Sequence, residues 1–355
     1  MNNKQTPLNN HFSWKILLII LAITTSLLHG CKQHNRWDID VSDIKSDIKI
    51  ERFDKDFNSL TPNENIGQQL QQLQLKYGQF YTDYIEQIIN AGSTSDTNYY
   101  QNIKKILRGK PYQQVRDEVQ KVYPTINQQQ TDLNDAFKHL KYYYPHIQLP
   151  RVISYFSGFE VQLPIGDNYI GIGLDLFLGA NNNYYKALTT QIPLYISKRF
   201  TPENIVPRVI EAFAREDLYP ERDEDRTLLS KMIYHGKIMV LLDAILPNTP
   251  DTLKIGYTQQ QLKWCEQHEN EIWGYFISEN LLFESDWLKI EKFINEAPFT
   301  PGLGEKKESA PKLARWIGWQ IARKYIQEHP QLTLPQLMNT LDAQKILTEA
   351  HYKPK

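Results

Sequence analysis

The sequence is poor in cysteine, with only Cys31 and Cys265 among its 355 residues. Two cysteines exclude the disulfide frameworks of small secreted domains and the cysteine clusters that hold structural zinc. Stability must therefore come from packing, for which 7 tryptophans, 21 tyrosines and 14 phenylalanines are available. Cys265 stands between Trp264 and Glu266, and we expect a buried, unreactive thiol there.

The chain also lacks a strong excess of one charge. Its 40 basic and 41 acidic residues give a formal net charge of −1. Residues 1–30 contain two lysines and no acid, so the rest of the chain has 38 basic and 41 acidic residues, a net charge of −3. This balance argues against nucleic acid as a partner and gives no reason to expect binding to anionic lipids.

Motifs that carry catalysis are missing as well. A zinc peptidase needs two histidines one helical turn apart with a glutamate between them, the HExxH pattern, and the sequence has none. His268-Glu-Asn-Glu-Ile272 begins this pattern but ends in isoleucine. The sequence has no GxSxG nucleophile elbow and no phosphate-binding loop. We therefore predict a protein that is not an enzyme, with no catalytic residue, bound metal or cofactor.

The N-terminal segment carries the strongest positive signal. Lys4 and Lys15 precede the 13 mostly apolar residues Ile16–Leu28, which is the length of a signal-peptide core and short for a membrane span. Leu28-His-Gly-Cys31 then resembles a bacterial lipobox. We predict that residues 1–30 are a lipoprotein signal peptide and that Cys31 carries diacylglycerol and an amide-linked fatty acid such as palmitate. An ordinary secretory signal, or a short anchor with an incidental cysteine, is the alternative.

The residues after Cys31 indicate where the protein lies. Residues 31–43 are polar and are predicted to form a tether that holds the folded part off the membrane. No acidic cluster follows Cys31 directly, so nothing there resembles a surface-export signal. We expect a lipid anchor in the cell envelope and favour a periplasm-facing protein, with the inner and the outer membrane both open.

The rest of the chain predicts one large α+β domain that is mainly α-helical. Its apolar residues repeat with a helical period on both sides of a short region with strand-like patterns. That region is expected to form a small antiparallel meander of three strands, Arg151–Phe156, Phe159–Leu163 and Tyr169–Leu176. The predicted parts of this domain, 44–355, are an N-terminal helical part over 44–147, the meander over 148–178 and a C-terminal helical part over 183–350.

Several helix boundaries and glycine positions are predicted individually. Thr201-Pro-Glu-Asn204 is a helix start, and a long apolar helix over Leu228–Leu246 is stopped by Pro247. Gly67 and Gly78 interrupt a helical pattern that runs from Ile66 to about Asn90, and a split is expected there. Gly318, among aromatic residues, indicates a place where another helix approaches closely.

A series of motifs in the mature chain resembles the GldB family of gliding-motility lipoproteins. The motifs are Glu51–Asp54, Thr227–Lys237, Ile255–Thr258, Gln261–Glu266, Glu269–Phe276, Ala297–Gly302, Trp316–Gln320 and Tyr352–Lys355. The resemblance implies a Bacteroidetes-type envelope lipoprotein that is required for gliding. It further implies contacts with proteins of the gliding machinery, a process tied in those bacteria to type IX secretion.

That family in turn is similar, more faintly, to a group of predicted zinc-dependent proteases. In those proteins the helix after the meander would carry HExxH, and here Ile210-Glu211-Ala-Phe-Ala214 keeps only the glutamate. An acidic third ligand would lie near Gly236, where this chain has His235. The resemblance implies a degenerate zincin-like core whose lost ligands suggest a binding or scaffolding role.

These patterns leave more than one function open. We predict a non-catalytic lipoprotein that acts through protein contacts, with a candidate groove or binding set of Glu211, His235, Trp264, Glu269, Trp273, Trp316 and Trp319. Core packing is the competing interpretation for each tryptophan. A metal-dependent peptidase or hydrolase with a rearranged site around Glu211, His235 and Glu269 is the alternative function. A periplasmic chaperone for exported adhesins is a third.

Overall fold

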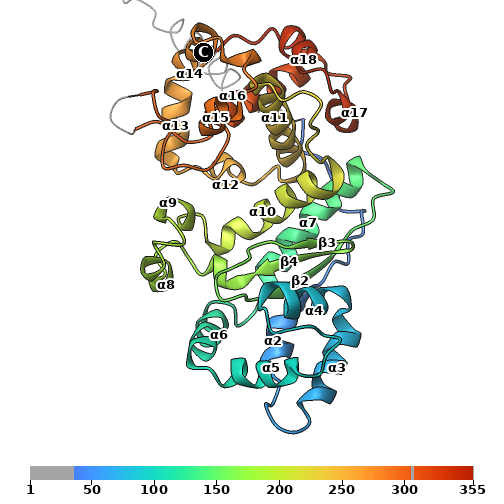
Figure 1. Ribbon diagram of the computed structural model, residues 1–355. Coiled ribbons are helices and arrows are strands. Elements are labelled where there is room, and N and C mark those ends of the chain that lie inside the picture. Colours follow the sequence, from blue (N-terminus) through green and yellow to red (C-terminus); the bar gives the residue numbers. More distant parts are fainter. Residues whose placement is uncertain (1–35, 305–307, 355) are drawn as a thin grey trace, which may run out of the picture. The chain divides into compact units, whose positions relative to one another are not determined.

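The computed structural model describes residues 36–304 and 308–354 (Figure 1). The predicted signal peptide, Cys31 and the first part of the tether lie outside these residues. The chain divides into two units, Met1–Ile39 and Asp40–Lys355. Of the first, the described residues form a turn in which the amide of Ile39 donates to the carbonyl of Trp37 (3.0 Å). No helix in the described ranges is long and apolar enough to span a membrane.

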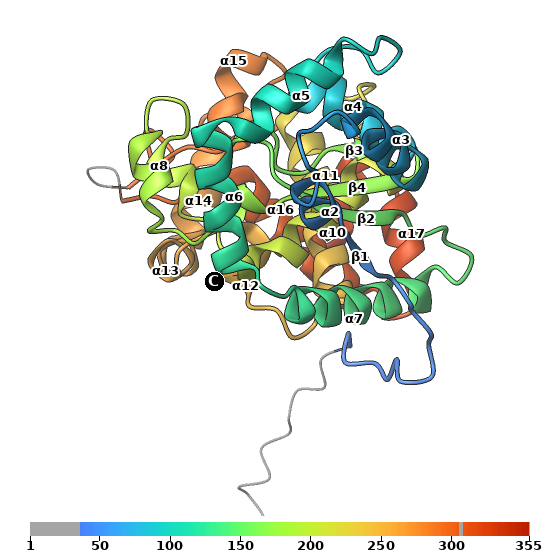
Figure 2. The same cartoon turned by 90° about the horizontal axis from the view of Figure 1, so that it is seen from below.

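The second unit is an α+β fold that is mainly helical, as predicted, and contains one small sheet. The strands are β1 (Ile50–Arg52), β2 (Arg151–Tyr155), β3 (Ile165–Gly166) and β4 (Tyr169–Gly173). They lie in the order β1-β2-β4-β3 (Figure 2). β2 pairs in parallel with both β1 and β4, whereas β3 and β4 form an antiparallel hairpin.

The predicted antiparallel meander is therefore wrong, because the sheet is mixed and Phe159–Leu163 is not a strand. Gly158 (φ +82°) and Phe159 (φ +72°) have left-handed backbone conformations, which a strand does not permit. The buried carboxylate of Asp175 accepts the amides of Ser157 (3.1 Å) and Phe159 (2.6 Å) and holds this loop. The chain can thus cross over and place β4 parallel to β2.

The helices before β2 form the N-terminal part, and those within residues 53–108 enclose an aromatic core. They are α2 (Phe53–Asn58), α3 (Ile66–Tyr77), α4 (Gln79–Asp83), η1 (Tyr84–Ile88), α5 (Tyr99–Arg108), α6 (Lys110–Val122) and α7 (Asn127–Tyr143). The break between α3 and α4 falls at Gly78, as predicted, but Gly67 lies inside α3 and does not interrupt it. At the centre the ring of Phe53 lies 4.9 Å from that of Tyr77 and 4.7 Å from that of Tyr84.

The C-terminal part is helical throughout. Its elements are η2 (Leu174–Phe177), α8 (Asn183–Ala187), α9 (Leu194–Ser197), η3 (Pro202–Asn204), α10 (Ile205–Phe213), η4 (Ala214–Leu218), α11 (Leu228–Ile245), α12 (Asp251–Ile255), α13 (Gln259–Gln267), α14 (Glu269–Ser278), η5 (Leu281–Phe283), α15 (Trp287–Ile290), η6 (Glu291–Phe293), α16 (Leu313–Glu328), α17 (Leu334–Asn339) and α18 (Ala343–Glu349). The predicted starts near Thr201 and Leu228 are confirmed.

Two glycines set the contact between α11 and α16, the most extensively packed pair of helices. A Cβ atom at Gly318 of α16 would collide with the carbonyl oxygen of Met232 in α11. A Cβ atom at Gly236 of α11 would collide with the backbone of Gly318. The predicted close approach of a helix at Gly318 is thus confirmed, and α11 is the helix that approaches.

Candidate functional site

The candidate site is built on α10, which comes after the sheet and the short helices α8 and α9 in the chain. Apolar residues such as Val209 and Ile210 are buried along it, and α10 contacts β4, α7 and α11. An apolar helix face buried against a sheet is a strong positional constraint. It fixes Glu211 in the interior, where only 3% of the residue is exposed.

Glu211 is held by two arginines. Arg208, one turn earlier on α10, donates to its Oε2 (2.9 Å), and Arg315 of α16 donates to its Oε1. Burial by itself raises the pKa of this carboxyl, but Arg315 and Arg208 outweigh burial and hold the pKa well below its ordinary value. Glu211 is therefore ionised, with both oxygens bound to guanidinium groups.

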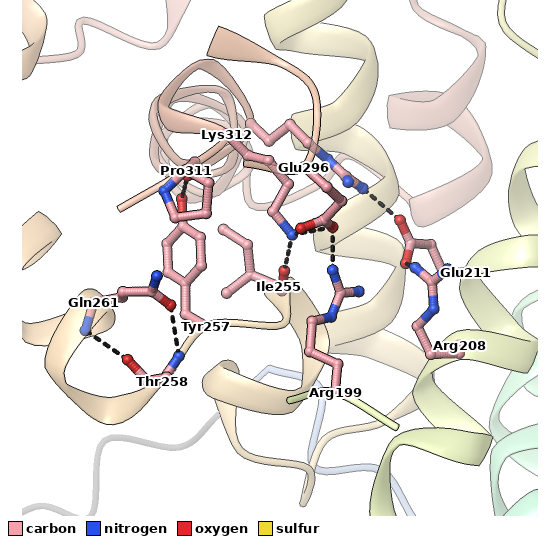
Figure 3. Close-up of polar contacts among 11 residues, drawn as sticks. Arg199, Arg208, Glu211, Ile255, Tyr257, Thr258, Gln261, Glu296, Pro311 and Lys312 are labelled. Carbon is pink, nitrogen blue, oxygen red and sulfur yellow. Dashed lines mark hydrogen bonds and ion pairs between the residues drawn. The ribbon is translucent and has the colours of Figure 1, made fainter. Parts of the chain in front are cut away.

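A second carboxylate lies in the same region. Lys312 (2.7 Å) and Arg199 both donate to Oε1 of Glu296, and their side chains approach it from different sides (Figure 3). Burial opposes ionisation of Glu296, yet Lys312 and Arg199 lower its pKa to about 2. Lys312 also donates to the carbonyl of Ile255 (2.6 Å). Burial, together with the nearby Arg199, lowers the pKa of Lys312 to about 7.

We call these six residues the arginine cluster: Arg199, Arg208, Glu211, Glu296, Lys312 and Arg315. Four basic side chains face two carboxylates, so the basic side chains are in excess. The Nε atoms of Arg199 and Arg315 are buried and have no hydrogen-bond partner among the described residues. A buried charge without a counter-charge is costly, which leaves this cluster able to accept a further anionic group.

The structure places His235 near this cluster. It is buried in α11, and burial, with Arg315 and Arg215 nearby, lowers its pKa well below the ordinary value. His235 is therefore neutral at physiological pH. Its charge environment includes Glu211, so the structure brings these two predicted residues into one region.

Glu269 belongs to a different place. It begins α14 and accepts a hydrogen bond from the hydroxyl of Tyr352 (2.6 Å). Within residues 36–304 and 308–354, no three His, Cys, Asp or Glu side chains are arranged so that they could hold a metal ion. The set Glu211, His235 and Glu269 is therefore not assembled as a ligand set.

The four predicted tryptophans lie on three helices. Trp264 of α13 stacks on His268 (ring centroids 4.5 Å apart), and Trp273 of α14 meets the edge of Tyr352 (5.4 Å). Trp316 and Trp319 of α16 are buried against each other (6.0 Å). Trp264 is also buried, whereas Trp273 is half-buried.

A cavity of about 380 Å³ adjoins the arginine cluster at the edge of the sheet. Its lining residues are Gln162, Leu163, Ile165, Arg208, Glu211, Ala212, Arg215 and Glu216. One wall is thus the chain segment that leads into β3, and the other is α10 with its continuation η4. An ionised carboxylate, two arginines and a strand edge converge there.

Reasoning from sequence found Glu211 and His235 but missed the partners of Glu211. Arg208 stands three residues before Glu211, which is the spacing of a helical ion pair and could have been noticed. Arg315 stands 104 residues away, between apolar neighbours on a helix that is buried nearly all round. An arginine in so apolar a helix is a signal for a buried counter-charge.

Comparison with protein families identifies a match over most of the chain. A sequence model described as gliding motility protein GldB matches residues 34–354, which is most of the chain. The match lends no support to the fainter resemblance to zinc-dependent proteases. No curated protein and no solved structure matches. The motifs quoted from the sequence and the family match agree, and the chain belongs to the GldB family of gliding motility proteins.

Proposed function

We propose that this protein is a non-catalytic envelope lipoprotein that supports gliding through contacts with other proteins. Membership of a gliding motility family supports the gliding role. The partners would be components of the gliding apparatus and of the type IX secretion machinery, and the anchor would be the acylated Cys31. The folded part would face the periplasm.

The single observation that carries the non-catalytic part is the state of Glu211. A glutamate that activates metal-bound water must accept a proton, so it needs a free oxygen and a pKa near the working pH. In Glu211 both oxygens are occupied by Arg208 and Arg315, and the pKa is held well below its ordinary value. Such a carboxylate is a poor base and a good structural counter-charge.

The residues next to Glu211 support the same proposal. In an HExxH helix the positions directly before the glutamate and three residues after it carry the metal-binding histidines. Here these positions are Ile210 and Ala214, which are buried and have no donor atom. A metal-dependent hydrolase would need ligands from elsewhere, and stoichiometric zinc in the purified mature protein, together with peptidase activity, would favour that alternative.

The experiment compares cells that produce the wild type, Cys31→Ala or Cys265→Ala. Chemical crosslinking of intact envelopes, followed by affinity purification and mass spectrometry, would identify neighbouring proteins, and spreading on agar would measure gliding. We expect the wild type to recover motility or secretion components and Cys31→Ala to recover fewer and to glide poorly. Cys265→Ala is the matched control, because it removes the other thiol, which is buried. Absence of any envelope partner in the wild-type sample would refute the proposal.

A further inference from the structure

The edge of the sheet at β3 has backbone groups that no strand covers. The carbonyl oxygens of Gln162 and Pro164 accept the amides of Gly173 and Gly171 in β4 (both 2.8 Å). In an antiparallel ladder, successive residues turn their N–H and C=O groups to opposite sides. Ile165 lies opposite Ile170 of β4. The backbone N–H and C=O groups of Leu163 and Ile165 therefore point away from β4.

These outward groups are available. In the described part of the chain, no hydrogen bond joins the backbone of Leu163 or Ile165 to another segment on the open side. Both residues are half-buried and line the 380 Å³ cavity. An edge of this kind can pair with a further strand, because the amides and carbonyls of Leu163 and Ile165 can form hydrogen bonds with it.

The opposite wall of the cavity, formed by α10 and η4, favours an acidic side chain in a segment bound at this edge. Arg208 retains 29% exposure of its side chain, and Arg215 has a buried Nε atom without a partner in the described residues. Glu211 is bound by both Arg208 and Arg315, and Glu216, which also lines this wall, is exposed. The arginine cluster behind the wall holds more basic side chains than carboxylates. A carboxylate that entered here would meet arginine donors suited to it.

We propose that this edge binds an extended segment of a partner protein, which adds as a strand beside Leu163 and Ile165 and places an acidic side chain against Arg208 and Arg215. We infer an extended segment from the outward backbone groups of the edge, and an acidic side chain from charge complementarity with the arginines. An apolar strand would leave the buried Nε atom of Arg215 without a partner, and a small anion would leave the outward backbone groups of Leu163 and Ile165 without partners. The inference rests on the proposed function as a contact protein and specifies where one contact is made.

The test uses the detergent-solubilised mature protein and an array of seven-residue peptides. The peptides are acetylated and amidated, rich in β-branched residues, and synthesised in pairs with Glu or Gln at the central position. Blocked ends ensure that any carboxylate preference comes from the side chain. We expect binders in which the Glu member is preferred about tenfold or more over its Gln partner, as for a charge-assisted contact.

Two variants separate the strand from the arginines. Leu163→Pro removes the outward amide without removing a bond to β4, and we expect it to weaken peptide binding about tenfold. Leu163→Ala keeps that amide and should retain most of the binding. Arg215→Gln should abolish the preference for Glu over Gln. Equal binding by the proline and alanine variants, or no preference for Glu in the wild type, would overturn the proposal.

Failure here can be told apart from failure of the proposed function. Envelope crosslinking of Leu163→Pro would recover fewer neighbouring proteins than Leu163→Ala if the edge makes the contact. If both variants recover the same motility components, the protein is still a contact protein, and the edge is not the place of contact.

Discussion

Two groups of buried charges lie along α16, one before Gly318 and one after it, and they are built differently. The Asp243 cluster comprises Asp243, Asp251, Lys254, Trp319 and Arg323. Both oxygens of Asp243 are occupied, Oδ1 by Lys254 (2.9 Å) and Oδ2 by Arg323 (2.7 Å) and the indole of Trp319 (2.8 Å). Two carboxylates face two basic side chains, and Arg323 also lies over the ring of Trp319 (3.8 Å).

The arginine cluster is not balanced in this way. It holds four basic side chains and two carboxylates, and it includes buried Nε atoms without partners in the described residues. It also borders a cavity, which none of the residues of the Asp243 cluster lines. A balanced buried cluster can only hold helices together, whereas an unbalanced one beside a cavity can also receive a charged group. The Asp243 cluster is therefore structural, whereas the arginine cluster is a candidate site.

The largest effect is expected from Glu211→Gln. The variant keeps the size of the side chain but leaves Arg315 buried with one carboxylate fewer in a region already rich in positive charge. We expect a loss of about 3–5 kcal/mol in the free energy of unfolding, measured with urea at pH 7. Glu216→Gln is the matched control, because Glu216 lines the same cavity and is exposed, and should change stability by less than about 0.5 kcal/mol. Equal stabilities of the two variants would contradict the role given to Glu211.

Gly318→Ala tests the helix crossing that lies between the two clusters. The added methyl group would meet the carbonyl of Met232, so α11 and α16 must move apart. We expect a loss of about 3 kcal/mol in the free energy of unfolding. Gly274→Ala is the control, because that helical glycine has open space around it and alanine there should stabilise by roughly 0.5–1 kcal/mol. A neutral Gly318→Ala would show that the crossing tolerates a side chain.

Asp243→Asn should have a smaller effect than Glu211→Gln. Asp251 remains near both Lys254 (3.5 Å) and Arg323 (2.9 Å) and can still balance part of their charge. We expect a loss of about 2–3 kcal/mol in the free energy of unfolding. Asp251→Asn, at a position that is one-third exposed, should cost about 1 kcal/mol or less. If Asp243→Asn costs more than Glu211→Gln, the two clusters do not differ as described.

Much of the helical architecture could be predicted from the sequence, because its signals are local. Apolar periodicity and capping residues predicted the helix start near Thr201 and the extent of α11. Gly318 predicted the close approach of a second helix. The pairing of the sheet could not be predicted in this way. β1 pairs with β2 across about 100 residues, and the parallel order depends on a loop held by the buried Asp175. No local pattern contains that information.

The candidate site was predictable in part for the same reason. The resemblance to known families pointed to Glu211 and His235, which share a region of the structure. Their surroundings are made by Arg315 and Arg199, which come from elements far apart in the chain. The sequence could not separate the buried Trp264, Trp316 and Trp319 from the half-buried Trp273, because core packing and a binding groove both place aromatic residues on apolar helix faces.

Lys312→Met tests the smallest expected effect, which is the contribution of Lys312 to the pH dependence of the free energy of unfolding. The ammonium of Lys312 has an ordinary pKa of 10.5, and burial together with Arg199 lowers the pKa to about 7 in the folded protein. Between about pH 7 and pH 10.5 the unfolded chain therefore binds a proton that the folded protein does not. The free energy of unfolding should rise with pH over this range because of Lys312, by at most about 1.4 kcal/mol per pH unit.

Methionine cannot titrate, so the variant should lack this part of the rise. The measurement is urea unfolding of the wild type and Lys312→Met at several pH values from 7 to 9.5, and the difference between the two curves removes the contributions of other groups. A difference that widens with pH in favour of the wild type supports a pKa of Lys312 that burial and Arg199 hold below its ordinary value. Parallel curves would mean that the ion pair with Glu296 fully offsets the effects of burial and Arg199 on the pKa of Lys312. The charges of the arginine cluster would then be as fully paired as those of the Asp243 cluster.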